Sequence, residues 1–224
     1  MKTENKTAII LGATGLTGGY VLNALLDDNR YSKVILFSRS SVEIKHEKLK
    51  EILVDMFHLE RYKSQFLADE VFCCVGTTKA KTPDKEQYKE IDYGIPVTVA
   101  RICKEQQIPS LLIISALGAN PNSSLFYSRL KGVMEKDVEE EQLEKVHFLQ
   151  PSLISGKRKE FRLGEWFMKQ LMKILNLVLV GPLDKYKSIH PKVIATAMIW
   201  LANNPYEKKR IPSDILKKLA RESA

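Results

Sequence analysis

The amino-acid sequence predicts an α/β fold with a doubly wound parallel sheet, and three observations lead to this prediction. Apolar runs of strand length alternate along the chain with longer helical patterns. The first run is followed by three glycines at three-residue spacing, after which a helical pattern begins. Hydrophobic residues make up 44% of the 224 residues, which is enough for one sizeable core. Near-continuous apolar strands separated by helices are typical of a parallel sheet that helices cover on both faces.

This alternation defines the expected elements and a single domain. The strands are expected at 8–11, 33–37, 51–55, 70–75, 110–115 and 146–150, and helices at 88–106, at 125–144 and from His190-Pro191 to Leu201. No internal repeat or low-complexity linker interrupts the chain, so we expect residues 1–224 to form one domain. Residues 152–190, which are less regular, and residues 204–224 are assigned to a small elaboration that caps the substrate side.

The glycines indicate a dinucleotide-binding turn. The apolar run 8–11 leads to Gly12, Gly15 and Gly18, and an apolar helix face follows. Gly12 allows a tight turn, Gly15 lets backbone amides approach a pyrophosphate, and Gly18 lets the helix pack close to the strand. The helix N-terminus then offers free N–H groups and the positive end of its dipole to the anion. The alternative is a plain strand–turn–helix connection without a ligand.

The end of the second strand indicates which nicotinamide cofactor is bound. An acidic residue at this point binds the ribose 2′-hydroxyl of NAD, whereas an arginine accommodates the 2′-phosphate of NADP. The strand 33–37 is followed by Ser38, Arg39 and Ser40, with no acidic residue. A guanidinium with hydroxyl neighbours suits a phosphate, so we predict NADP(H) rather than NAD(H). The alternative is that Arg39 is a solvated loop residue. Asp55 is expected beside the adenine amino group.

Three residues form a candidate catalytic group. Ser115 ends the fifth strand, and Tyr127 and Lys131 lie four residues apart, on one face of the next helix. A phenol with an ordinary pKa of about 10 is a poor acid–base catalyst at neutral pH, and a nearby ammonium lowers that pKa toward the working range. We expect Tyr127 to transfer the proton, Lys131 to tune it and hold the nicotinamide ribose, and Ser115 to hydrogen-bond the substrate carbonyl oxygen. The alternative is an ordinary exposed helix pair.

Together these motifs resemble a known enzyme family. The glycine turn with Ser115, Tyr127 and Lys131 resembles an atypical short-chain dehydrogenase/reductase. The stretches 73–78 (CCVGTT) and 162–166 (RLGEW) are similar to the Tat-interacting-protein-like branch of NAD(P)H-binding oxidoreductases. The resemblance implies a Rossmann fold that binds NADPH, with Gly76 and Thr77 beside the cofactor, and an active-site triad of Ser115, Tyr127 and Lys131.

The complete predicted site combines these inferences. The catalytic residues are Ser115, Tyr127 and Lys131. The cofactor-binding residues are Gly12, Thr14, Gly15, Leu16, Thr17, Gly18, Ser38, Arg39, Asp55, Gly76, Thr77, Tyr127, Lys131, Pro151 and Leu153. The histidines are scattered, and no metal site is predicted.

Two functions from different classes fit this site. The first is an NADP(H)-dependent oxidoreductase that transfers a hydride between nicotinamide and a small or lipophilic carbonyl or alcohol substrate. The second is a non-catalytic NADPH-binding regulatory or redox-sensing protein that acts through a protein partner. The intact Tyr127–Lys131 pair favours the enzyme, because a sensor does not need it.

Composition and charge limit which partners, cysteine-based sites and cellular locations we expect. The net charge of +8 comes from lysines and arginines spread over the chain without an aromatic–basic array, so nucleic-acid binding is not expected. The three cysteines lack CxxC spacing, which indicates neither a disulfide framework nor a zinc site and fits a reducing compartment. The first residues lack the apolar segment of a secretory signal, and we expect a cytoplasmic location.

The stretch 157–180 begins with basic residues and becomes apolar. Lys169 and Lys173 interrupt the apolar run, which is shorter than the roughly 18 uncharged residues that a membrane span needs. A helix packed over the substrate cleft is the preferred interpretation. A surface for homodimerisation or for contact with a membrane is the alternative, and a lid that orders on substrate binding is compatible with both. His190 is expected to cap a helix or to pack in the core.

Overall fold

A single parallel sheet forms the centre of the molecule. The computed structural model describes residues 5–155 and 185–223. Within these residues the sheet has seven strands in the order β3-β2-β1-β4-β5-β6-β7. Their bounds are β1 Lys6–Leu11, β2 Tyr31–Ser38, β3 Leu49–Leu53, β4 Glu70–Cys73, β5 Ser110–Ile114, β6 Lys145–Gln150 and β7 Arg210–Pro212. This order is that of a doubly wound Rossmann sheet with one added edge strand, and the predicted fold class is confirmed.

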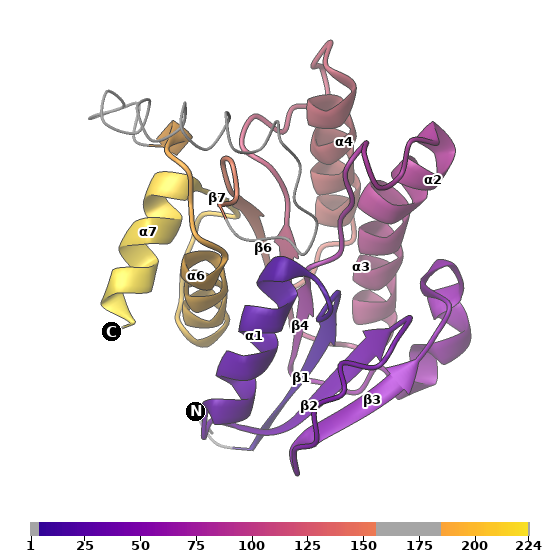
Figure 1. Cartoon of the computed structure of the whole chain (residues 1–224), viewed down its shortest axis with the longest axis vertical. Coiled ribbons are helices and arrows are strands. Elements are labelled where there is room, and N and C mark those ends of the chain that lie inside the picture. Colours follow the sequence, from indigo (N-terminus) through magenta and orange to yellow (C-terminus); the bar gives the residue numbers. More distant parts are fainter. Residues whose placement is uncertain (1–4, 156–184, 224) are drawn as a thin grey trace.

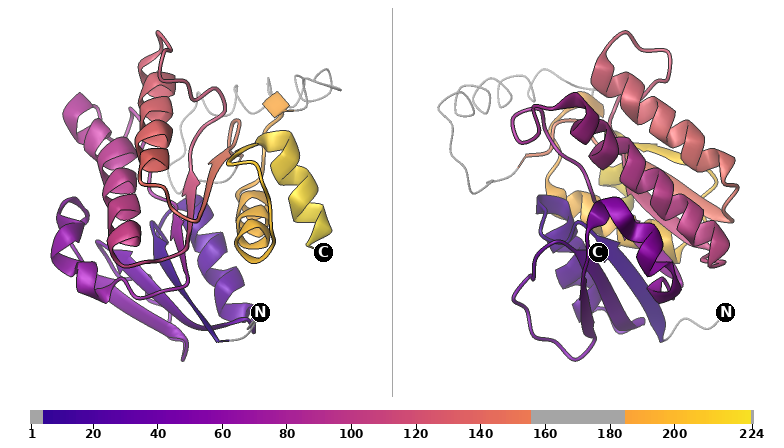
Figure 2. Two further views of the ribbon diagram at one scale, coloured as in Figure 1. Left: turned by 180° about the vertical axis from the view of Figure 1, so that it is seen from behind. Right: turned by 90° about the vertical axis from the view of Figure 1, so that its right-hand side faces the viewer.

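Helices cover both faces of this sheet (Figures 1 and 2). One face carries α1, α6 and α7, and the other carries η1, α3 and α4, with the short elements α2 and η2 leading into α3. Their bounds are α1 Leu16–Asp27, η1 Met56–Gln65, α2 Lys85–Lys89, η2 Glu90–Gly94, α3 Ile95–Glu105, α4 Phe126–Glu140, α6 Pro191–Asn203 and α7 Ser213–Glu222. Each layer buries its own apolar cluster against the sheet.

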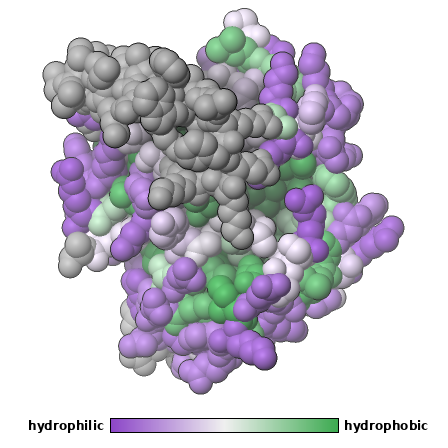
Figure 3. Space-filling view, in the orientation of Figure 1, coloured by the Kyte–Doolittle hydropathy of each residue, from purple (hydrophilic) through white to green (hydrophobic). Residues whose placement is uncertain are grey.

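The central strands are buried on both faces, which explains their continuous apolar runs. Ile9 of β1 lies opposite Ile35 of β2 and Val71 of β4 in parallel register. Residues 8–11 are completely buried. Figure 3 shows hydrophilic residues over most of the margin of one face, with apolar residues gathered toward its middle.

Several element boundaries differ from those predicted. The helix expected over 88–106 contains a π-helical turn, η2, between α2 and α3. The helix expected over 125–144 ends at Glu140, because Gln142 adopts a left-handed φ of 54°. The strand expected at 51–55 is displaced to Leu49–Leu53, so Asp55 instead caps η1 and accepts a hydrogen bond from the backbone N–H of Phe57.

The C-terminal segment adds to the main sheet. Residues 204–224 were assigned from the sequence to the substrate-side elaboration, and the strand β7 was not predicted. In the structure Arg210–Pro212 pairs with β6 in parallel, and α7 packs against α6. His190 caps α6 by accepting a hydrogen bond from the N–H of Lys192 at 3.2 Å, which confirms its predicted capping role.

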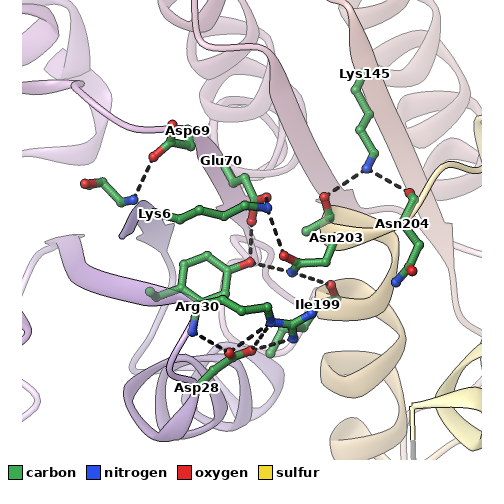
Figure 4. Close-up of polar contacts among 12 residues, drawn as sticks. Lys6, Asp28, Arg30, Asp69, Glu70, Lys145, Ile199, Asn203 and Asn204 are labelled. Atoms are coloured by element: carbon green, nitrogen blue, oxygen red, sulfur yellow. Dashed lines mark hydrogen bonds and ion pairs between the residues drawn. The ribbon is translucent and has the colours of Figure 1, made fainter. Parts of the chain in front are cut away.

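A polar cluster ties the strands together at the amino edge of the sheet (Figure 4). The carboxylate of Glu70, 3% exposed, accepts hydrogen bonds from the ammonium of Lys6 at 2.6 Å and from the hydroxyl of Tyr31. Asn203 at the end of α6 donates to the Tyr31 hydroxyl at 2.7 Å and accepts from Lys6 at 2.8 Å. These contacts join β1, β2, β4 and α6, and each of these polar groups has a partner.

His147 is a buried titratable group of β6. Its side chain is 2% exposed, and its Nδ1 donates to the carbonyl oxygen of Lys208 at 3.0 Å. Its Nε2 is buried and has no partner among the described residues. Burial lowers the pKa of His147 from 6.5 to about 4, because none of the described groups accepts a hydrogen bond from a second ring proton.

This depressed pKa predicts acid-sensitive stability. The unfolded chain binds the His147 proton at a higher pH than the folded protein does, so the stabilisation is complete above pH 6.5 and is lost as the pH falls toward 4. Between pH 7.5 and pH 5 the loss in the free energy of unfolding should be about 2 kcal/mol. Urea unfolding across this range should therefore show a steeper pH dependence for the natural protein than for His147→Gln. Equal slopes in the two proteins would contradict this account.

Candidate functional site

The glycine turn after β1 is packed so closely that side chains cannot enter it. Gly12 has a φ of +85°, and a Cβ atom on it would lie 2.8 Å from the backbone of Cys74 after β4. A Cβ atom on Gly18 would lie 2.2 Å from the carbonyl oxygen of Gly12. The N–H of Gly15 closes the turn by donating to the same carbonyl at 2.9 Å. The turn thus holds the N-terminus of α1 at the carboxyl edge between β1 and β4, where the strand order reverses.

The N-terminus of α1 fits an anionic ligand. The first turn of α1 has no acidic residue and no side-chain cap. The backbone N–H groups of Leu16 and Thr17 have no acceptor among the described residues. Unpaired N–H groups at the positive end of a helix are a ready binding site for a phosphate. The residues present therefore fit the pyrophosphate of a dinucleotide.

A buried ion pair lies at the centre of the predicted site. The ammonium of Lys131 is 2.9 Å from Oδ1 of Asp92, and the two side chains are 2% and 1% exposed. Oδ2 of Asp92 accepts a hydrogen bond from the backbone N–H of Thr77 at 2.8 Å. Burial alone would lower the pKa of Lys131, but the Asp92 carboxylate raises it above its ordinary value. Asp92 thereby links the loop after β4 to helix α4.

Tyr127 lies one helical turn before Lys131. Its side chain is 42% exposed, and its ring meets that of Tyr88 edge-on, with a centroid distance of 6.4 Å. The hydroxyl has no hydrogen-bond partner among the described residues. Burial raises the pKa of Tyr127, Lys131 lowers it and Asp92 raises it, so the pKa lies above its ordinary value of 10.0. The predicted lowering by Lys131 is present, but burial, together with the smaller effect of Asp92, outweighs it.

Ser115 belongs to a second buried network. It follows β5, is 2% exposed, and donates its hydroxyl hydrogen to Oε1 of Glu135 at 2.5 Å. Glu135 also accepts from Gln150 at 2.9 Å and pairs with Arg210 of β7 at 2.8 Å. In this arrangement the Ser115 oxygen can accept a hydrogen bond from a substrate, but it can donate one only after turning away from Glu135.

The ends of β2 and β3 carry the predicted ribose and adenine residues. Ser38 is 4% exposed, and its hydroxyl donates to the carbonyl oxygen of Ser40 at 3.0 Å. Arg39 is exposed and makes no hydrogen bond or ion pair within the described part of the chain. Asp55 uses its two carboxylate oxygens to cap η1 and to contact His58 at 2.8 Å. Arg39 is thus available to a phosphate, while Asp55 already has local partners.

The remaining predicted residues lie at the same edge or outside the described residues. Gly76 is exposed, and Asp92 is 3.5 Å from where its Cβ atom would lie. After β6, Pro151 accepts from the N–H of Leu117 at 3.0 Å, and Leu153 is 51% exposed. The RLGEW stretch and the apolar run lie outside the described residues. The cofactor and catalytic roles of all these residues stay predictions.

Two buried carboxylates, Asp92 and Glu135, were missed by the sequence analysis. Both lie on the apolar face of their helix: Asp92 is in helical spacing with Ile95 and Val99, and Glu135 is adjacent to Met134. An acidic residue on a buried face needs a partner, because an unpaired buried charge is costly. This spacing, together with the four-residue separation of Lys131 and Glu135, could have indicated from the sequence that both carboxylates are buried and paired.

Comparison with known proteins identifies the family. Residues 8–151 match the family described as the NAD dependent epimerase/dehydratase family. The chain belongs to this family. Protein HTATIP2 of Rattus norvegicus is 31% identical over 207 residues, which are 91% of this chain and 82% of the relative. "Protein FMP52, mitochondrial" of Debaryomyces hansenii is 31% identical over 157 residues, 69% of each chain.

Solved structures of epimerase/dehydratase-type proteins share the fold of this family member. The UDP-N-acetylglucosamine 4-epimerase of Methanobrevibacter ruminantium M1 has a TM-score of 0.66 and 20% identity, covering 93% of this chain and 76% of the other. The Bordetella bronchiseptica enzyme WbmH, solved in complex with NAD+, has a TM-score of 0.67 and 16% identity, covering 91% and 74%. The fold is thus an NAD(P)-binding Rossmann fold, as the sequence predicts.

The location of the protein stays a prediction. The fungal relative is named mitochondrial, whereas the sequence analysis expects the cytoplasm. Within residues 5–155 and 185–223, no helix combines the length and apolar character needed to cross a membrane.

The glycine packing predicts different outcomes for two neighbouring substitutions. Gly18→Ala should lower the free energy of unfolding by about 2 kcal/mol or more, because its Cβ atom would overlap the backbone of Gly12. The matched control is Gly19→Ala, whose Cβ atom would be 3.4 Å from the Ala13 carbonyl oxygen. An alanine inside a helix is favourable by about 0.8 kcal/mol relative to glycine, so this variant should be close to the natural protein. Urea unfolding of both variants measures the difference, and equal stabilities would show that the turn can relax.

Proposed function

We propose that this family member is an NADP(H)-dependent oxidoreductase that transfers a hydride between nicotinamide and a small or lipophilic carbonyl or alcohol substrate. The observation that carries the proposal is the position of Tyr127 directly before the buried Lys131–Asp92 pair, while Asp92 also holds the loop after β4. Gly12 of the dinucleotide turn packs against the backbone of the same loop, at Cys74. The proton-transfer group and the nucleotide-binding turn therefore belong to one edge of the sheet.

The residues divide into a binding group and a proton-transfer group. The N–H groups of Leu16 and Thr17 would hold the pyrophosphate, and Arg39 would hold the ribose 2′-phosphate. Lys131 would hold the nicotinamide ribose. When bound, NADPH would supply the hydride, which brings two electrons to the carbonyl carbon. The chain itself supplies the proton that completes the alcohol.

Tyr127 provides that proton from its hydroxyl oxygen. As the substrate C=O π bond opens, the oxygen takes the proton of Tyr127, and the C–O single bond of the alcohol remains. The Lys131 ammonium stabilises the resulting phenolate, which then regains a proton from solvent. Ser115 contributes by orienting the substrate oxygen after its hydroxyl turns away from Glu135.

Exposed apolar side chains at this edge support a lipophilic substrate. Leu125, directly before α4, is 68% exposed, and Leu153, after β6, is 51% exposed. Single exposed leucines are common on protein surfaces, but at this edge they offer apolar surface to a bound substrate. Neither side chain is suited to binding a sugar hydroxyl.

One observation favours the second function, a non-catalytic NADPH-binding regulator. The hydroxyl hydrogen of Ser115 is already committed to the Glu135 carboxylate, so one member of the triad is not free to donate. A regulator would bind NADPH through the glycine turn and show no turnover. Oxidation of NADPH in the presence of aldehydes and ketones distinguishes the two functions.

Removal of the Tyr127 hydroxyl tests the enzyme. Tyr127→Phe should lower the rate of NADPH oxidation over a panel of aldehydes and ketones by roughly 10²-fold or more, because general acid catalysis is lost. NADPH binding, measured by fluorescence, should change little. Tyr93→Phe is the control, since the Tyr93 hydroxyl already donates a hydrogen bond to Asp137 of α4 at 2.7 Å. Equal rates for Tyr127→Phe and the natural protein would exclude the proposed reduction.

Removal of the Arg39 guanidinium tests the choice of cofactor. Arg39→Ala should weaken NADPH binding by about tenfold or more and leave NADH binding nearly unchanged, since a charged hydrogen bond to phosphate contributes about 1.5–3 kcal/mol. The control is Arg101→Ala, an exposed arginine of α3 paired with Glu60 and Glu141. If the ratio of the two dissociation constants does not change, the 2′-phosphate site lies elsewhere or the protein uses NAD.

A further inference from the structure

Asp92 is one of two acidic residues, with Glu135, that are almost completely buried near the predicted catalytic group. It is 1% exposed, and each of its carboxylate oxygens has one partner: the Lys131 ammonium at 2.9 Å and the N–H of Thr77 at 2.8 Å. These partners come from α4 and from the loop after β4, while Asp92 itself lies on η2. One side chain thus connects three segments that meet at the carboxyl edge of the sheet.

The local backbone and the energetics both indicate a role beyond stability. A π-helical turn such as η2, Glu90–Gly94, is a rare irregularity that often occurs at functional sites. A buried ion pair contributes little net stability, because removing two charges from water offsets their attraction, and apolar residues of similar size are often as stable. Packing alone therefore does not account for Asp92 and Lys131 at these positions.

The charges that act on Tyr127 come from two sides. On its own helix the Lys131 ammonium attracts the phenolate form. From η2 the Asp92 carboxylate repels that form, and from α2 the phenol of Tyr88 packs against the ring. Cys73 of β4 also faces Lys131, but as a thiol it carries no charge, because burial raises its pKa to about 11. Among these charged groups Asp92 is the one that opposes Lys131, and burial raises the pKa of Tyr127 in the same direction.

We propose that Asp92 is a positioning residue that ties the Lys131 ammonium to the loop of Thr77 through its two carboxylate oxygens and helps to keep Tyr127 protonated, so that the site is prepared to donate a proton in carbonyl reduction. The reduction rests on the proposed function, whereas the effect of Asp92 on Tyr127 does not. In the opposite direction, alcohol oxidation, the site would have to begin with a phenolate beside a carboxylate. The contact of Asp92 with Lys131 at 2.9 Å, one helical turn after Tyr127, supports this assignment, and the pKa of Tyr127 is raised by burial and by Asp92.

Titration of Tyr127 in the full-length chain without cofactor tests the proposal. Tyrosines labelled with 13C at Cζ are followed by NMR as the pH is raised, and the Tyr127 signal is assigned by its loss in Tyr127→Phe. Asp92→Asn keeps a carbonyl oxygen for the Thr77 N–H but removes the charge. We expect it to lower the pKa of Tyr127 by about one unit or more. A Tyr127 pKa that is unchanged or higher in Asp92→Asn overturns the proposal.

Asp137→Asn is the matched control. Asp137 accepts a hydrogen bond from the Tyr93 hydroxyl at 2.7 Å and raises the pKa of Tyr93. This variant should lower the pKa of Tyr93 and leave that of Tyr127 as it is. A fall in the Tyr127 pKa in this variant as well would mean that the effect is not specific to Asp92, which also overturns the proposal.

A second pair of variants keeps the test decisive if Asp92→Asn alone does not fold with an unpaired Lys131. Lys131→Met removes the ammonium, and the double variant Asp92→Asn, Lys131→Met removes both charges. The Tyr127 pKa should be higher in Lys131→Met than in the natural protein, and lower in the double variant than in Lys131→Met. Equal Tyr127 pKa values in these two variants overturn the proposal.

Failure of this proposal can be distinguished from failure of the proposed function. The titration requires no turnover, so a natural protein that oxidises no NADPH overturns the oxidoreductase while a lowered Tyr127 pKa still supports the charge effect of Asp92. Conversely, an active natural protein with an unchanged Tyr127 pKa in Asp92→Asn overturns only the role of Asp92. Where turnover is found, the pH at which the reduction rate declines should also be lower in Asp92→Asn.

Discussion

The close approach of backbones at the glycine turn determines where every other part of the site can lie. The carbonyl of Gly12 is in contact with Gly18 of α1, and the α-carbon of Gly12 faces the backbone of Cys74 after β4. These contacts leave no room for a Cβ atom, so the turn fixes the N-terminus of α1 at the point where the strand order reverses. The loop after β4, which carries Gly76 and Thr77, is held at the same point. Because Thr77 is bound to Asp92 and Asp92 to Lys131, helix α4 is connected to the same loop.

How much of this arrangement can be predicted from the sequence depends on the range of the interactions involved. The glycine turn and the strands β1, β2 and β6 are determined by short segments, so their residues alone predict them. The strand β7 has three residues and follows a glutamate and two lysines, and only pairing with β6 makes it a strand. Likewise, the ion pair of Asp92 joins residues 39 positions apart in the sequence. The position of Tyr127 beside Lys131 could be predicted from their spacing, but the net direction of its pKa could not, because it depends on burial in the fold and on Asp92 from another helix.

A tyrosine, a lysine and a carboxylate lie together at each of the two edges of the sheet, but the two groups have different roles. At the amino edge a tyrosine, a lysine and a carboxylate, Tyr31, Lys6 and Glu70, form a closed network with Asn203. Tyr31 is completely buried, and burial and Glu70 keep its pKa above the ordinary range, so it cannot exchange a proton at neutral pH. At the carboxyl edge the corresponding groups are Tyr127, Lys131 and Asp92.

The difference between these two groups lies in the hydroxyl. The Tyr31 hydroxyl donates to Glu70 and accepts from Asn203, whereas the Tyr127 hydroxyl has no partner within residues 5–155 and 185–223, and its side chain is 42% exposed. A partly exposed hydroxyl next to a buried ion pair is open to a ligand, with water as its partner until one binds. The free N–H groups of α1 and the exposed Arg39 at the same edge are open in the same way. A carbonyl oxygen at Tyr127 and a phosphorylated dinucleotide along α1 would satisfy these groups together, which explains why such groups are left open at one edge and closed at the other.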